Sequence, residues 1–214
     1  MLSLLIAACA LLRVATSANA SSYVVTLEEV GSNVVATGSG EIDLSGLNYE
    51  MTVTLSVPGL FPNFPGGGGA AIHTGTGPED VYSAVTWAGP TSFGGGLGSP
   101  ATSAAGGAVG LVTPPPGSPP PPFNSLIIEV PQAYTFGTVI FDSATYNNAT
   151  FASLGLTPGT YVWTWGAGPD QRFTLEIGPT PLPAALPLFA TGLGGLGLLG
   201  WRRKRKNTAA LAAA

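Results

Sequence analysis

The chain contains a single histidine, His73, which lies between two glycine-rich runs. Glu79 and Asp80 follow it six and seven residues later, and one imidazole with two carboxylates could in principle hold a divalent cation. A histidine on a surface loop explains the same residues, and the sequence favours that interpretation. We therefore expect no metal site and no cofactor.

Carboxylates are the other candidates for acid–base chemistry, because Cys9 is the only cysteine and no second histidine is present. The spacing of six of them favours no pair: Glu28, Glu29, Glu41, Asp43, Glu129 and Asp142. The sequence contains no Gly-x-Ser-x-Gly, no His-Glu-x-x-His, no calcium-loop spacing and no phosphate-binding Gly-x-x-x-x-Gly-Lys. We expect a protein that is not an enzyme, with a secreted glycosidase, which needs only two carboxylates, as a remote alternative.

Aromatic side chains offer a different chemistry. Tyr161, Trp163 and Trp165 alternate along the chain and would share one face of a strand. Such a stripe could form a platform that stacks on sugar rings, with Trp87 as a further member, or it could pack in the core. The opposite face of the same strand carries smaller residues, which favours the core.

The elements that would position these residues are strands. Charged residues make up 8% of the chain, against roughly 25% in soluble domains. The 31 glycines and 20 prolines favour turns and strands over long helices. Because basic residues gather only at the end of an otherwise acidic chain, the sequence also argues against a nucleic-acid-binding protein.

Apolar and polar residues alternate over 47–57, which predicts a half-buried antiparallel strand. Residues 23–30 and 34–37 predict a hairpin with a connection at 31–33. Further strands are expected at 81–87, 126–130, 138–142, 160–165 and 172–177. The pattern predicts an all-β fold, an antiparallel β-sandwich of the jelly-roll kind. Nine glycines, nine prolines and no charge in 89–122 predict a loop or flexible insert within it.

The N-terminal residues predict a signal peptide. Residues 2–12 form an apolar run that is too short to span a membrane, and small residues stand at Ala18 and Ala20, where a signal peptidase needs them. We expect cleavage after Ala20, which leaves an exported domain at 21–178. Residues 6–9 also resemble a lipobox ending in Cys9, so a lipoprotein is the alternative.

The C-terminal residues predict a single transmembrane helix. Residues 182–201 carry no formal charge and would span about 30 Å as a helix. A basic cluster follows, formed by Arg202, Arg203, Lys204, Arg205 and Lys206. Such clusters stay on the cytoplasmic side, so residues 207–214 would be a short cytoplasmic tail and 21–178 would lie outside. The exported domain then holds all 11 acidic residues and one basic residue, Arg172.

One motif resembles a known sorting signal. A proline-rich stretch precedes a Gly/Leu-rich span, Trp201 and the basic cluster, and its residues are Thr180, Pro181, Leu182, Pro183, Ala184, Ala185, Leu186 and Pro187. This order over 179–206 resembles the PEP-CTERM sorting signal in its VPLPA variant. The resemblance implies a Gram-negative bacterium that makes exopolysaccharide, and recognition by an exosortase, a membrane-embedded cysteine transpeptidase.

The expected partners are thus the general secretion machinery, a signal peptidase and an exosortase-type enzyme. We expect a membrane precursor that is processed into a surface or extracellular-matrix protein with a structural role. The alternative is a carbohydrate-binding module that attaches to exopolysaccharide through the aromatic stripe.

Overall fold

The computed structural model describes residues 22–54, 57–63, 69–119, 124–168 and 170–178. These residues form thirteen β-strands and no helix, so the expected all-β fold is confirmed. No helix long and apolar enough to cross a membrane occurs among them. The expected signal peptide with Ala18 and Ala20, the sorting motif, the membrane span, the basic cluster and the tail lie outside the described residues.

The first sheet has six strands in the order β12-β13-β1-β2-β11-β8. Their bounds are β1 Tyr23–Val30, β2 Asn33–Gly40, β8 Ser103–Gly106, β11 Ile140–Tyr146, β12 Gly159–Thr164 and β13 Arg172–Ile177. Neighbouring strands are antiparallel except β1 and β13, which run parallel. The first and last strands of the sandwich are therefore hydrogen-bonded neighbours inside one sheet.

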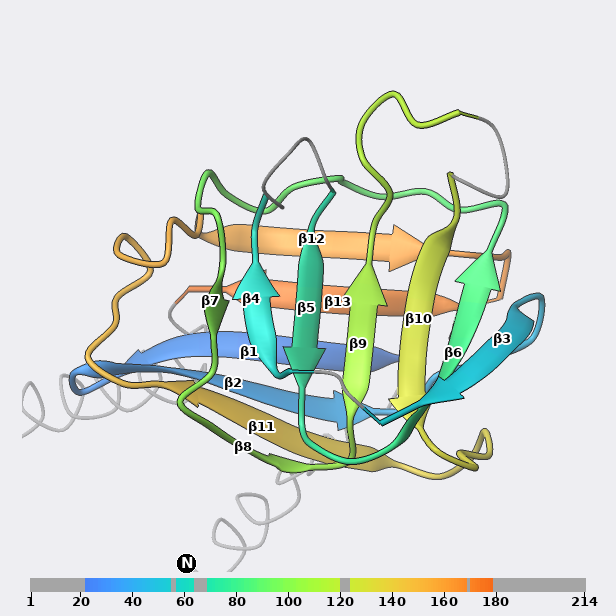
Figure 1. Cartoon of the computed structure of the whole chain (residues 1–214), viewed down its shortest axis with the longest axis horizontal. Helices are drawn as coiled ribbons and strands as arrows, with labels where there is room; N and C mark the ends of the chain where they lie inside the picture. The colour runs from blue at the N-terminus through green and yellow to red at the C-terminus, as the bar shows by residue number, and fades with distance from the viewer. Residues whose placement is uncertain (1–21, 55–56, 64–68, 120–123, 169, 179–214) are drawn as a thin grey trace, which may run out of the picture. The chain divides into compact units, whose positions relative to one another are not determined.

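The second sheet has seven strands in the order β3-β6-β10-β9-β5-β4-β7. Their bounds are β3 Asn48–Val53, β4 Gly59–Phe61, β5 Ala71–Thr74, β6 Glu79–Ala84, β7 Ser99–Pro100, β9 Val109–Val112 and β10 Leu126–Pro131. Figure 1 shows this sheet in front of the first, with its strands crossing those behind it steeply. The arrangement is that of a β-sandwich with crossed sheets, and it contains more strands than the sequence predicted.

The core lies between the sheets and is built by alternation along the strands. On β1, Tyr23, Val25 and Leu27 are fully buried, while the residues between them are partly exposed. Alternate residues of β10, Leu126 and Ile128 among them, are buried in the facing sheet. Because successive side chains of a strand point to opposite faces, these two sets meet in the interior.

Several strands confirm the expectations from sequence. The hairpin of β1 and β2 is present, with Gly31 and Ser32 between Val30 and Asn33 and a positive φ at Gly31. Strand β13 has the expected bounds, β10 differs by one residue at its end, and β12 lies one residue earlier than expected. Strands β6 and β11 overlap the expected strands at 81–87 and 138–142, but both ends of each strand differ from the expectation by two or more residues.

Two expectations were wrong. Strand β3, within the alternating stretch 47–57, is not half-buried, because it lies at the edge of its sheet and a β-bulge between Tyr49 and Met51 interrupts the alternation. Tyr49 is 57% exposed and Met51 55%. The stretch 89–122 is also more than a loop, since it contributes β7, β8 and β9, and β9 lies inside the seven-stranded sheet.

Candidate functional site

The single histidine lies on a strand, so the surface-loop interpretation was wrong. His73 belongs to β5, with Ile72 and Thr74 buried on either side of it. Thr74 Oγ1 lies 3.4 Å from the hydroxyl of Tyr23 in the opposite sheet, so Thr74 points inward. His73 therefore points to the outer face of the seven-stranded sheet.

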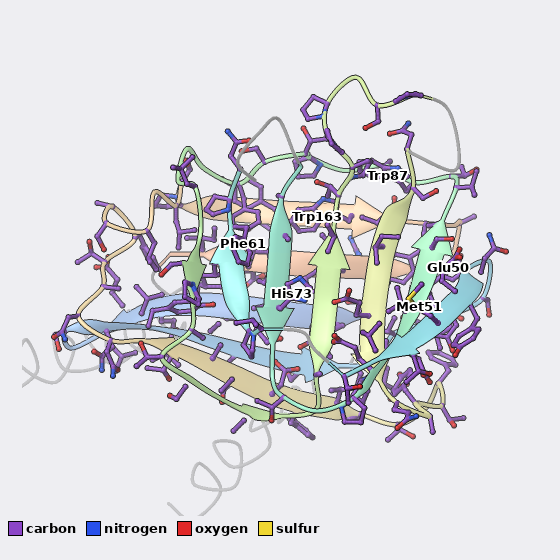
Figure 2. The ribbon with its side chains drawn as sticks, viewed as in Figure 1. Glu50, Met51, Phe61, His73, Trp87 and Trp163 are labelled. Atoms are coloured by element: carbon purple, nitrogen blue, oxygen red, sulfur yellow. The ribbon has the colours of Figure 1, made fainter. Side chains whose placement is uncertain are left out.

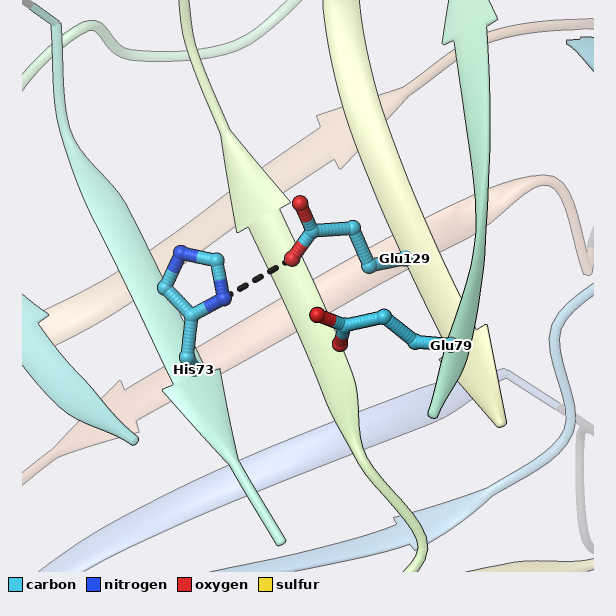
Figure 3. A group of neighbouring side chains, drawn as sticks. All are labelled: His73, Glu79 and Glu129. Carbon is cyan, nitrogen blue, oxygen red and sulfur yellow. Dashed lines mark ion pairs between the residues drawn. The ribbon is translucent and has the colours of Figure 1, made fainter. Parts of the chain in front are cut away.

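Two carboxylates reach the same place on that face. Glu129 on β10 and His73 on β5 both pair with Gly110 of the intervening strand β9, which puts the three residues in one row. Glu79 on β6 pairs with Pro131, two residues along β10 from Glu129, and so shares its face. Figure 3 shows the three side chains converging above β9. We call His73, Glu79 and Glu129 the His–Glu–Glu cluster.

The cluster is tightly arranged. His73 Nδ1 lies 2.8 Å from Glu129 Oε2, and one ligand atom of each of the three residues lies within 4.8 Å of the others. Glu79 is 1% exposed, whereas the side chains of His73 and Glu129 are 16% and 12% exposed. Solvent thus reaches one side of a largely buried group of one imidazole and two carboxylates.

Gly110 makes the convergence possible. A Cβ at this position would lie 2.1 Å from Glu129 Oε2 and 2.7 Å from His73 Nδ1, closer than real Cβ contacts occur. Any other residue would displace the ion pair from the space above β9. The φ of Gly110 is not in the left-handed region, so this position favours glycine because of the space that the two side chains occupy and not because of its backbone conformation.

The charge of the cluster is notable because the sequence contains no lysine or arginine between Arg13 and Arg172. Arg172 lies on β13 in the other sheet, paired with Thr164. Asp80, which the sequence grouped with His73, belongs elsewhere: its carboxylate accepts hydrogen bonds from Thr52 Oγ1 at 2.6 Å and from the backbone N–H of Ala133 at 2.9 Å. The sequence therefore identified His73 and Glu79 correctly as neighbours but assigned them the wrong third residue.

A second polar group lies between the sheets. The hydroxyl of Tyr23 donates a short hydrogen bond to Asp142 Oδ2. Burial raises the pKa of Asp142 above its ordinary value, and hydrogen bonds from Tyr23 and Thr74 oppose that effect. The pKa of Tyr23 is raised as well, by burial first and by the Asp142 charge second. Tyr23, Thr74 and Asp142 are all buried, so solvent does not reach this group.

The aromatic stripe is mainly core, so the sugar-platform hypothesis was wrong for its two tryptophans. Trp163 is fully buried and Trp165 nearly so, because this face of β12 and the residue after it turns inward toward the other sheet. Trp163 Nε1 donates to the carbonyl of Pro90, and Trp165 Nε1 to that of Asp43. Trp87, labelled with Trp163 in Figure 2, is half-buried and donates to the carbonyl of Asn124. Tyr161 is half-buried and packs against the core.

The six carboxylates considered for acid–base work are dispersed. Glu28 and Glu29 lie on β1, Asp142 lies between the sheets, and Glu129 lies on the outer face of the second sheet. The neighbour that Glu129 does have, Glu79, was not in that set.

No family model, curated protein or solved structure matches the chain.

Proposed function

We propose that the chain is an exported surface or extracellular-matrix protein whose β-sandwich has a structural, non-catalytic role. The observation that carries the proposal is the position of the terminal strands. The sandwich starts with β1 at Tyr23 and finishes with β13 at Ile177, and these strands pair with each other over five residues. A domain closed by its own end strands does not need the segments beyond them to complete its core.

The composition of the domain supports the same proposal. Residues 21–178 contain 11 acidic residues and one basic residue, and such a charge keeps a protein soluble after release. The carbohydrate-binding alternative has lost its main support, because Trp163 and Trp165, two members of the expected platform, are in the core. The sorting signal is proposed to hold the precursor in the membrane until an exosortase-type enzyme cleaves it.

Reporter fusions test the orientation. A reporter that is active only outside the cytoplasm should be active when fused after residue 178 and inactive when fused after residue 206, because the cluster from Arg202 to Lys206 stays in the cytoplasm. The opposite pattern of activity would show that the orientation is reversed.

Mass spectrometry of the mature protein from the native host tests the processing. Because prolines disfavour a helix, we expect the stretch around Pro181 and Pro183 to be extended, as a peptidase requires. The mature protein should lack the residues after this motif, and replacing both prolines by alanine should leave the full-length form in the membrane. The control replaces Pro115 and Pro116, which are exposed in a loop, and should be processed normally. An intact C-terminus on the mature wild-type protein would overturn the proposal.

A further inference from the structure

We propose that the His–Glu–Glu cluster is a binding site for a divalent transition-metal ion of the Zn²⁺ type. The site is independent of how the chain is sorted, because all three residues belong to the sandwich. His73, Glu79 and Glu129 come from three different strands and are brought together only by the fold.

The donor set identifies the class of ion. Carboxylate oxygens alone suit Ca²⁺ and Mg²⁺, whereas an imidazole nitrogen favours zinc and its neighbours in the first transition series. One nitrogen and two oxygens are three protein ligands, the number found in zinc sites that leave a further position open to water. The partial exposure of His73 and Glu129 gives the ion and its water a path to that position.

The spacing of the ligand atoms is close to what an ion needs. Two ligands of a tetrahedral Zn²⁺ with bonds of about 2.1 Å lie about 3.4 Å apart. The ligand atoms of the cluster lie within 4.8 Å of one another, and the pair His73 Nδ1 and Glu129 Oε2 is at 2.8 Å. Side-chain rotations that open the His73–Glu129 pair would bring its two ligand atoms to the spacing of a bound ion.

Charge gives the reason for an ion to bind. Two carboxylates share a largely buried site, and the sequence supplies no lysine or arginine for more than 50 residues on either side of Glu79. Burying like charges together is unfavourable unless a cation or a proton compensates them. A protonated His73 supplies one positive charge, while a divalent ion supplies two and bonds directly to all three residues. Because Gly110 has no side chain, it leaves space beside His73 and Glu129.

The test uses the full-length chain in detergent micelles, with Cys9 replaced by serine so that the thiol does not compete for zinc. Because His73 is the only histidine, its ring nitrogens give one set of ¹⁵N signals in an NMR spectrum. Titration with Zn²⁺ should shift these signals to those of a metal-bound imidazole, and calorimetry should show one ion per chain. Ca²⁺ and Mg²⁺ at the same concentration should leave the signals unchanged.

Three variants give the comparison. His73→Gln and Glu129→Gln should each weaken Zn²⁺ binding at least tenfold in calorimetry. The matched control is Asp80→Asn, which removes the same charge one residue from Glu79 but on a carboxylate that bonds to Thr52 and Ala133, and it should bind Zn²⁺ as the wild type does. Circular dichroism of each variant shows whether the sandwich is still folded.

Three results would overturn the proposal. The first is a set of His73 ring ¹⁵N signals that shift with pH but not with millimolar Zn²⁺. That result would mean that His73 and Glu129 form an ion pair and bind no metal. The second is equal weakening by Asp80→Asn and Glu129→Gln, which would indicate diffuse attraction to an acidic protein. The third is binding of Ca²⁺ or Mg²⁺ as tight as that of Zn²⁺, which would exclude a site whose imidazole makes it selective for transition-metal ions.

Discussion

Replacing Trp163 by alanine should destabilise the sandwich strongly. The indole is fully buried, and its ring centroid lies 6.1 Å from that of Phe173 and 6.5 Å from that of Phe93. Its Nε1–H donates to the carbonyl of Pro90 at 2.6 Å, and the ring lies so close to Gly89 that a Cβ there would be 2.5 Å from Trp163 Cδ1. The side chain thus joins β12 to the segment after β6.

The magnitude follows from the area that the indole buries. A buried tryptophan removes about 200 Å² from water, which at about 25 cal/mol per Å² is worth about 5 kcal/mol. The extended-chain reference overstates this area, while loss of the hydrogen bond to Pro90 adds about 1 kcal/mol, so we expect a loss of about 4 kcal/mol. That is a large part of the 5–15 kcal/mol, roughly, by which domains are stable.

Urea unfolding measures the effect. With a slope of about 2 kcal/mol per molar urea, the midpoint should fall by about 2 M. Trp163→Phe keeps most of the apolar surface and should lose about half as much or less. The control Tyr161→Phe removes a hydroxyl that donates to the carbonyl of Thr157 on the surface and should cost below about 1 kcal/mol. A loss under about 1 kcal/mol for Trp163→Ala would refute the core assignment of this residue.

Three further changes follow from the structure. Gly110→Ala should cost about 1–3 kcal/mol in urea unfolding and also abolish Zn²⁺ binding, because the new Cβ occupies the space of the His73–Glu129 pair; normal zinc affinity would contradict the geometry. Asp142→Asn should alter the pH dependence of unfolding: a pKa raised above 3.8 by burial means that the contribution of this carboxyl is fully present below about pH 3.8 and is lost as the pH rises through the native pKa. The variant should therefore gain stability relative to the wild type between acidic and neutral pH, and a constant difference would refute the shift. Met51→Lys on the edge strand, labelled in Figure 2, should change stability by less than about 0.5 kcal/mol, whereas a half-buried strand would lose more.

The sequence predicted those strands best in which hydrophobic residues alternate and one face is buried. Strand β1 is such a strand: Tyr23, Val25 and Leu27 are buried, the residues between them are partly exposed, and its bounds are the expected ones. The alternation of apolar and polar residues at 47–57 was misleading. Alternation is a property of the local sequence, whereas the burial of a strand depends on which other parts of the fold cover it. Strand β3 lies at the edge of its sheet, and the side chains of Tyr49 and Met51 are more than half exposed.

The part of the site that sequence could not predict is the row across β5, β9 and β10. Glu129 lies 56 positions after His73, and only the pairing of both residues with Gly110 brings them together. In a chain with 31 glycines, a glycine inside a short strand cannot be distinguished by composition from one in a turn.

The same arrangement occurs a second time, and this suggests what the glycines inside the strands are for. Gly38 on β2 pairs with Asp142 on β11, and a Cβ at Gly38 would lie 2.3 Å from Asp142 Oδ1 and closer still to the hydroxyl of Tyr23. In both sheets, polar side chains of the two flanking strands meet above a glycine of the strand between them. A missing side chain thereby makes room for a buried polar pair that a β-branched residue would have excluded. The Tyr23–Asp142 pair is enclosed between the sheets and the His73–Glu129 pair is open on one side, so only the second is accessible to an ion from solution.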